Sequence, residues 1–414
     1  MAARAATGVI RIPAGLHRGT TVATRAGFRA VAVLLWWAAE TDPRRELVNL
    51  GGIGLAAAES DAACVAWAVD EAAASTRSRR FRGDSAFLAP GHPDGQPAVD
   101  GRLVASDEGF VLELDGEATR QWHVRYLALG GDVRGAAVRR VELDAGTTAV
   151  SGLGFRPDLL VFLPEPGREA TFGLGIGVAS SPDAQAAAGV EARVVSEGTL
   201  ARGALRGDAV LAVPRPDDSG EYAAVGRLVS VDSDGFTLSC ELDGSLTVSV
   251  LALHGGVYDV GVASAPARSG GRTKIVGPHP AAALLFTTGL DVMERIRDIA
   301  RLAIGVVAGD DAGSVTWSMR RWDGPPEPRA RATAGHALEV LDTESGELHA
   351  QSVFDGFDRG ALRLRWPIAD RSGRDLVYVT VGLAEQTTGQ PRLRLWQHFT
   401  RHLHGSARAP GRGM

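Results

Sequence analysis

The segment YLALGG, Tyr126–Gly131, decides the fold of this chain, because similar segments return further along. Leu251–Gly256 reads LALHGG, and Tyr378–Leu383 reads YVTVGL. Each copy follows the previous one after about 125 residues, which is the size of a domain and far above the period of a solenoid repeat. The spacing therefore predicts tandem domains.

Three earlier landmarks precede this closing segment in the same order in every copy. The first opens an apolar segment at Gly27-Phe28, Gly154-Phe155 and, more weakly, Gly277-Pro278. The second is rich in small residues: GGIGLA (Gly51–Ala56), GLGIGVA (Gly173–Ala179) and AIGVVA (Ala303–Ala308). The third is DEGFVLEL (Asp107–Leu114), SDGFTLSC (Ser233–Cys240) and FDRGALRLRW (Phe357–Trp366). We predict domains at residues 1–131, 132–256 and 257–384, followed by a basic carboxyl-terminal tail at residues 385–414.

Within a copy the apolar residues alternate, which is the pattern of a half-buried strand. In GFTLSCEL, Phe236 and Leu238 fall on one face and Thr237 on the other, and Phe110 and Leu112 take the inward positions in the first copy. About seven or eight such strands in each copy, separated by turn signals, indicate an antiparallel sandwich. The predicted fold class is all-β: three tandem, jelly-roll-like β-sandwich domains, for which a pseudo-threefold body is one packing.

Two segments need separate interpretation. In LDVMERIRDIARLAIG, residues 290–305, Met293, Ile296 and Ala300 share one face of a helix, so we predict a helical insertion peculiar to the third copy. GLGIGVA superficially resembles a dinucleotide fingerprint, but its glycine spacing differs and no helix follows it. Its alternating small residues instead predict that another sheet or subunit approaches closely.

The ordered landmarks resemble a tandem repeat of virion-associated proteins of tailed bacteriophages and prophages, with a GF-x-P-D strand, a G-x-G-x-A strand, an S-x-GFT strand and a closing YLALGG. The agreement is strongest in GFRPDLLVFLP, GLGIGVA, SDGFTLSC and YLALGG, and the third copy departs most. The resemblance touches residues 1–384 through short motifs. It implies a structural or attachment component of a tail, baseplate or head, with no catalytic residues to carry over.

The length and composition are those of a multidomain globular chain. It has 414 residues, of which 45% are hydrophobic. Its longest apolar run, Ala30–Ala39, is about half of what a membrane-spanning helix needs, and no secretory signal is legible at the amino terminus. We therefore expect synthesis in the bacterial cytoplasm without membrane insertion. Cys64 and Cys240 do not correspond between copies, so we predict two small buried residues without a disulfide.

Charge is unevenly distributed along the chain. Residues 1–39 hold five arginines and no acidic residue, and residues 386–414 hold another five and no acidic residue, although the net charge of the whole chain is −5. An acidic body thus carries two basic ends, which are either solvated tails or segments that dock on acidic surfaces of neighbouring subunits. Nucleic acid is not an expected partner, because the acidic body repels phosphate.

No motif predicts catalysis, a cofactor or a metal site. The HGG at His254–Gly256 is found in some oxyanion holes, but the serine elbow that should accompany it is absent. His398, His402 and His404 are close in sequence without a neighbouring acidic residue or cysteine, and a docking segment is favoured over a metal site. The pairs Asp217-Asp218 and Asp310-Asp311 lack the alternating oxygen ligands of a calcium loop and are interpreted as solvated loops.

Five large residues are candidates for interaction. Trp36 and Trp37 are adjacent, so in a strand they point to opposite faces, and both are buried only if the sheet is covered on both sides. The alternative is an exposed ring that stacks on a sugar. In the tail, Trp396, Phe399 and Leu403 stand among basic residues and could anchor a docking segment.

The sequence thus favours a non-enzymatic structural component of a phage or phage-like particle. Its expected partners are other subunits of the particle, including further copies of the chain. The alternative hypothesis is a carbohydrate-binding module for host recognition, whose partner is a host-surface glycan. Such a module is expected to place exposed aromatic residues beside Asp or Asn at equivalent positions in at least two copies.

Overall fold

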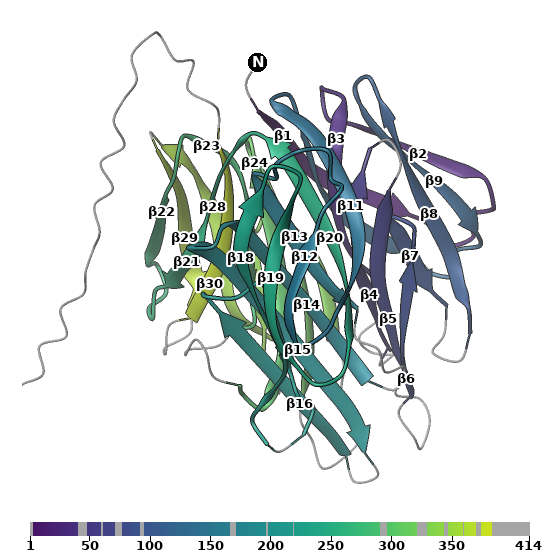
Figure 1. Cartoon of the computed structure of the whole chain (residues 1–414). Helices are drawn as coiled ribbons and strands as arrows, with labels where there is room; N and C mark the ends of the chain where they lie inside the picture. Colours follow the sequence, from purple (N-terminus) through teal and green to yellow (C-terminus); the bar gives the residue numbers. More distant parts are fainter. Residues whose placement is uncertain are drawn as a thin grey trace, which may run out of the picture. The chain divides into compact units, whose positions relative to one another are not determined.

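The computed structural model describes residues 3–39, 48–58, 61–70, 77–91, 95–165, 171–195, 198–217, 219–289, 296–320, 329–342, 347–358, 360–369 and 374–382. All regular secondary structure in these ranges consists of strands (Figure 1). The predicted all-β class and the sandwich architecture are confirmed. Within the same ranges, no helix has the length and apolar character needed to cross a membrane.

Ten strands in the described residues form the first domain, more than the seven or eight predicted. Their bounds are β1 (Arg4–Ile12), β2 (Thr20–Arg25), β3 (Ala30–Ala39), β4 (Val48–Ala57), β5 (Ala62–Asp70), β6 (Arg77–Gly83), β7 (Phe87–Pro90), β8 (Pro97–Ser106), β9 (Gly109–Gly116) and β10 (Trp122–Gly130). The extra elements include β7, whose four residues are too short to show an alternating pattern.

The second and third domains repeat this order of strands. The second has β11 (Val133–Leu143), β12 (Gly146–Val150), β13 (Leu159–Glu165), β14 (Thr171–Ser181), β15 (Ala184–Val195), β16 (Gly198–Arg206), β17 (Leu211–Pro214), β18 (Tyr222–Asp232), β19 (Gly235–Leu242) and β20 (Leu246–Gly255). The third has β21 (Val257–Ala265), β22 (Arg272–Val276), β23 (Pro280–Thr287), β24 (Ile299–Ala308), β25 (Asp311–Arg320), β26 (Arg329–Ala334), β27 (Leu338–Leu341), β28 (Leu348–Asp358), β29 (Ala361–Ile368) and β30 (Arg374–Gly382).

Each domain is a sandwich of a six-stranded and a four-stranded antiparallel sheet. In the first domain the orders are β1-β10-β3-β4-β5-β6 and β2-β9-β8-β7, and the other two domains repeat both orders. The first strand of a domain pairs with its last strand in the six-stranded sheet, and the second strand pairs with the last but one in the four-stranded sheet. The two ends of the domain thus lie side by side in both sheets, as in a jelly roll.

The closing motif YLALGG lies on β10, between β1 and β3. Leu127 pairs with Leu34 of β3 and with Thr7 of β1. Leu127 and Leu129 face the other domains, whereas Tyr126 and Ala128 face the four-stranded sheet. A strand that is buried on both faces needs apolar residues at consecutive positions, which explains the continuous apolar motif.

Four large hydrophobic cores and one small cluster organise the described residues. Each sandwich has its own core between its two sheets: Trp37 and Phe110 lie in the first sandwich core, Phe162 and Phe236 in the second, and Trp366 in the third. A further core joins the domains. This central core is built by the opposite faces of the three six-stranded sheets and includes Trp36, Trp67, Leu163, Ile176, Phe286 and Trp317.

The domains contact one another in a repeated, cyclic way. Strand β11 packs on β4 of the first domain, β21 packs on β14 and β15 of the second, and β1 packs on β24 and β25 of the third. Each domain therefore touches the other two through equivalent strands, which is the pattern of a pseudo-threefold body. Residues 1–384 form one compact unit.

The small-residue segments allow close approach between the sheets, as predicted. A Cβ atom at Gly177 would lie 1.8 Å from the carbonyl oxygen of Val210, just before β17. The equivalent distances are 1.9 Å from Gly54 to Ala86 and 1.7 Å from Gly305 to Ala337. The four-stranded sheet of each domain thus rests directly on the backbone of a glycine.

Replacing Gly177 by alanine is expected to lower the free energy of unfolding by about 1–3 kcal/mol, because the new methyl group forces the backbone of the two sheets apart. Chemical denaturation of the purified chain measures this loss. Gly135→Ala is the matched control, since a Cβ there meets its nearest atoms at 3.5 Å, an ordinary contact distance. Equal losses in the two variants would contradict the close approach.

The predicted helix at residues 290–305 is wrong over its described part. Ile299–Ala308 is strand β24, and Arg297 forms an isolated bridge with Gly203 of β16. The side chains of β24 are buried in the central core on one face and in the third sandwich core on the other. The apolar residues of such a strand lose the period of two, and their spacing can then match a helix. Residues 290–295, including Met293, lie outside the described residues.

The inward positions and the two cysteines agree with the sequence analysis. Phe110, Leu112, Phe236 and Leu238 are fully buried in their sandwich cores. Cys64 and Cys240 are buried free thiols, and burial raises their pKa values, to about 12 and about 11 respectively. Neither thiol is therefore poised as a nucleophile.

Candidate functional site

The two adjacent tryptophans pack in different cores. Trp36 lies in the central core and Trp37 in the first sandwich core, and both have 0% exposed surface. The six-stranded sheet is thus covered on both sides, and neither ring is accessible to a sugar. Trp396, Phe399 and Leu403 lie outside the described residues, so their docking role stays a prediction.

The HGG segment forms a turn. The ring of His254 stacks on Phe155 with 5.6 Å between centroids, and the backbone N–H of Gly255 donates to Asp158 at 2.7 Å. Gly255 and Gly256 have φ values of +83° and +85°, which favour glycine. The motif is therefore explained by the turn between two domains.

The acidic residues that the sequence offered as metal ligands form no metal site among the described residues. Asp311 accepts a hydrogen bond from the backbone N–H of Ala312, and Asp217 accepts one from Ser219. No group of three or more potential ligands occurs in the described ranges. Asp218 and the three tail histidines are outside those ranges.

Each of the three junctions between domains contains a buried arginine. At the first, Nη2 of Arg80 in β6 contacts Oε2 of Glu191 in β15 at 2.6 Å. At the second, Arg202 of β16 pairs with Asp298, which precedes β24. At the third, Arg125 of β10 donates to a backbone carbonyl oxygen of β26. Their side-chain partners or acceptors differ at each junction, so each contact is specific to one pair of domains.

The Arg80–Glu191 contact at the first junction also depends on Gly173, which has no side chain. A Cβ at Gly173 would lie 2.1 Å from Nη2 of Arg80 and 2.3 Å from Oε1 of Glu191. The strand register places Leu50 and Arg301 at the equivalent positions of the other domains. At this strand position only the second domain leaves room for a guanidinium from its neighbour, whereas the third domain makes room for Arg125 at Gly313, where a Cβ would lie 2.5 Å from the guanidinium. The buried ion pair of Arg80 and Glu191 was not predicted, because these two residues are far apart in sequence.

A second polar network lies at the same junction. Nε of Arg140 contacts Oε1 of buried Glu165 at 3.1 Å, and Arg140 also pairs with Asp84 of the first domain. Arg139 contacts Asp61 across the junction at 3.0 Å. Burial disfavours the charged form of Arg140, but Glu165 and Asp84 outweigh this effect and raise its pKa. These contacts hold the domains together.

A pocket lies on the outer side of the second domain. Ala224 and Leu228 of β18 face the second sandwich core, so Val225 and Arg227 lie on the outer face of the sheet. There the pocket opens, with a volume of about 370 Å³, and we call it the charged pocket. It is lined by Arg206, Glu221, Tyr222, Ala223, Val225, Arg227, Glu241, Leu242 and Asp243.

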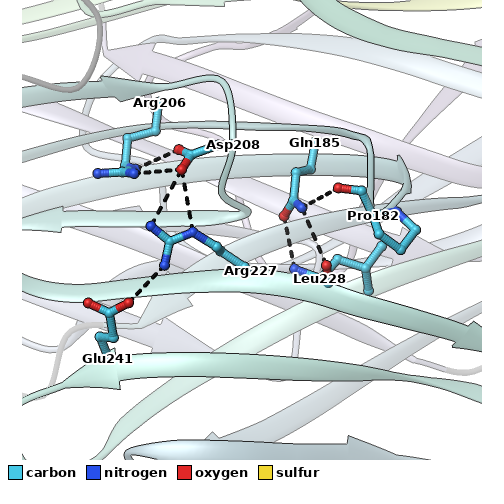
Figure 2. A network of polar contacts seen from close by, with 7 residues as sticks. All are labelled: Pro182, Gln185, Arg206, Asp208, Arg227, Leu228 and Glu241. Carbon is cyan, nitrogen blue, oxygen red and sulfur yellow. Dashed lines mark hydrogen bonds and ion pairs between the residues drawn. The ribbon is translucent and has the colours of Figure 1, made fainter.

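The arginines of the charged pocket are held by carboxylates (Figure 2). Asp208 accepts from Nε and Nη2 of Arg206 at 2.8 and 2.7 Å, and its Oδ2 lies 3.4 Å from both Nε and Nη2 of Arg227. Nη1 of Arg227 donates to Oε1 of Glu241 at 2.9 Å. Hydrogen bonds from Arg206 lower the pKa of Asp208, so this carboxylate stays ionised at neutral pH.

One side of the pocket rests on the junction with the third domain. The guanidinium carbon of Arg206 lies 5.3 Å from the centroid of the Tyr222 ring, a cation–π distance. Ile296 of the third domain packs in the same small cluster as Tyr222, together with Ala204 of β16. The shape of this wall therefore depends on both domains.

Gln185 fixes the strand that carries Arg227. Its Oε1 accepts from the N–H of Leu228 at 2.9 Å, and its Nε2 donates to the carbonyl oxygens of Leu228 and Pro182 (Figure 2). The register of β18 shifts just beyond this residue, between Leu228 and Ser230. Gln185 thus takes the place of a strand partner at the bulge.

Among the described residues, only the second domain has an arginine at both of the strand positions that Arg206 and Arg227 occupy. In the first and third domains, Gly83 and Thr333 occupy the strand position of Arg206. Arg102 and Val353 occupy the strand position of Arg227. The pocket was not predicted from the sequence, because its residues belong to three separate segments. The Arg206–Asp208 spacing was the one local signal, and alone it does not indicate a site.

The chain matches no known protein-family model, no curated protein and no solved structure.

Proposed function

We propose that this chain is a non-enzymatic structural component of a phage or phage-like particle, placed in its tail, baseplate or head. The observation that carries the proposal is the central core, because three β-sandwich domains bury one face of each six-stranded sheet against the others. Residues 1–384 thus form one compact unit rather than a string of separate modules. The ordered landmarks shared with virion-associated repeats support the same proposal.

The junctions add to this argument. A buried arginine at each junction meets a different partner, so the domains can associate in only one order. Breaking the Arg80–Glu191 contact leaves a buried carboxylate without its guanidinium, which penalises alternative arrangements at that junction. A compact unit with its outer sheets free is suited to repeated contacts with other subunits, including further copies of the chain.

The proposal is tested on particles. Particles are purified by density gradient from cultures of the bacterium that encodes the chain and are analysed by quantitative mass spectrometry. The chain is expected in the particle band, at a constant ratio to the major particle proteins across the gradient. Particles that lack the chain while it remains in the cell lysate would contradict the proposal.

The basic tail offers a prediction about assembly. Deleting residues 386–414, which carry five arginines and no acidic residue, is expected to leave the three domains folded and to weaken self-association. Light scattering measures the molar mass of full-length and truncated protein across a salt series, and higher salt should also weaken assembly of the full-length chain.

A shorter deletion is the matched control for the tail. Removing only residues 405–414 takes away two arginines but keeps Trp396, Phe399 and Leu403. This variant is expected to assemble like the full-length chain if the apolar residues are the anchors. Identical molar masses for all three proteins at every salt concentration would show that the tail has no docking role.

A further inference from the structure

We infer that the charged pocket binds a neutral, hydroxyl-rich ligand, such as one sugar unit of a glycan. This inference does not rest on the particle proposal, since it concerns one pocket on the second domain. The pocket volume of about 370 Å³ is within the range of small-molecule sites, about 300–1,000 Å³. Trp36 and Trp37, for which the sequence left sugar stacking open, do not line this pocket.

The charges of the lining exclude ionic ligands. With the ion-pair partners of the lining included, four carboxylates face three guanidiniums. The carboxylates belong to Asp208, Glu221, Glu241 and Asp243, and the guanidiniums to Arg206, Arg215 and Arg227. An anion is repelled by this excess of acidic groups, and a cation meets three arginines that are already fixed in place. A ligand without net charge avoids both costs.

The hydrogen-bonding groups match hydroxyls, which donate and accept at once. Arg227 offers N–H donors beyond the three that bond Asp208 and Glu241. The side chain of Glu241 is 78% exposed, so its carboxylate remains accessible as an acceptor while it holds Arg227. A donor and an acceptor thus stand side by side on the outer face of the sheet, as vicinal hydroxyls of a sugar require.

The apolar part of the lining suits the carbon face of a sugar ring. Val225 lines the pocket but is only 5% exposed, so the apolar surface comes mainly from the half-buried ring of Tyr222, over which the guanidinium of Arg206 lies. Sites for small polar ligands combine such an apolar surface with a few oriented polar groups.

The polar groups are also fixed before any ligand arrives. Asp208 bonds both arginines, and Gln185 holds the backbone of Leu228 next to Arg227. Groups that are ordered in advance lose little conformational entropy on binding, which favours recognition over a random surface cluster.

Binding is measured by NMR titration of the full chain with glucose, galactose, mannose, rhamnose and N-acetylglucosamine. At least one of these sugars is expected to bind with a Kd on the order of 1 mM. Arg227→Ala should weaken that binding at least tenfold. Arg102→Ala is the matched control, because Arg102 occupies the equivalent position in the first domain, and it should bind like the native chain.

Three outcomes decide the inference. If none of the five sugars binds the native chain, or if Arg227→Ala binds as the native chain does, the inference is wrong. Glucose 6-phosphate serves as the charged probe, and tighter binding of it than of glucose would contradict the argument from charge. Thermal melting checks that Arg227→Ala is folded, and Glu241→Gln, which keeps the shape of the side chain, provides a second variant with an expected loss of binding.

Discussion

Replacing Arg80 by methionine is expected to lower the free energy of unfolding by about 3–5 kcal/mol at about pH 8, because the buried carboxylate of Glu191 loses its partner. Methionine keeps the unbranched apolar stem of the arginine side chain but lacks the guanidinium that lies beside Gly173. The two charged groups are each only 6% exposed, so water cannot replace the missing guanidinium. Urea denaturation followed by tryptophan fluorescence measures the loss.

The size of this loss depends on pH in a defined direction. Burial raises the pKa of the Glu191 carboxyl from 4.5 to about 7, although Arg80 lowers it. The folded chain therefore holds a proton that the unfolded chain releases in this window, so the free energy of unfolding falls as the pH rises from about 4.5 to about 7. Without Arg80 the pKa rises further, and the fall continues to higher pH. At about pH 5 both proteins carry a protonated Glu191, and the loss is expected to be much smaller.

A double variant separates this explanation from simple loss of packing. Arg80→Met together with Glu191→Gln removes both charges and should recover most of the stability at about pH 8. A double variant as unstable as Arg80→Met would show that the ion pair is not the cause. A loss that does not change with pH would lead to the same conclusion.

Replacing Phe236 by alanine is expected to lower the free energy of unfolding by about 3–5 kcal/mol, through the lost transfer free energy and the cavity left behind. The ring is fully buried in the second sandwich core and contacts Phe162 edge to face, with 5.9 Å between centroids. Thr237→Ala is the control on the same strand, because Thr237 points to the opposite, partly exposed face.

The shape of the unfolding transition carries additional information. The central core couples the second domain to the other two, so the Phe236→Ala chain is expected to unfold in one transition at a lower temperature. Scanning calorimetry measures this. Two separated transitions, one of them unchanged from the native chain, would show that the domains unfold independently. A variant that melts like the native chain would remove the assigned inward face.

The repeated architecture could be predicted because the apolar residues of the repeated motifs mark the buried positions of each strand. Phe236 and Leu238 alternate with half-exposed residues, and the adjacent Trp36 and Trp37 favoured a sheet that is covered on both faces over an exposed ring that stacks on a sugar. Glycine spacing in Gly173–Ala179 signalled close approach, since a side chain at Gly177 has no space. These features depend on neighbours within one strand.

Features that depend on distant segments could not be predicted. Strand β24 has buried residues on both faces, so its periodicity indicated a helix instead of a strand. Arg80 and Glu191 meet only because two domains pack together, and the charged pocket unites Arg206 with Arg227 and Glu241 across the fold. Their sequence surroundings are ordinary for charged surface residues.

The central core has a consequence for how the chain behaves on dilution. Three separate sandwich domains with the same apolar faces would associate as a trimer, whose stability depends on protein concentration. Here short connections join the domains: only Gly131 and Asp132 lie between β10 and β11, and only Gly256 lies between β20 and β21. Covalent linkage keeps each face at a high effective concentration near its partners. The three domains should therefore stay together on dilution to concentrations at which a trimer of free domains would come apart.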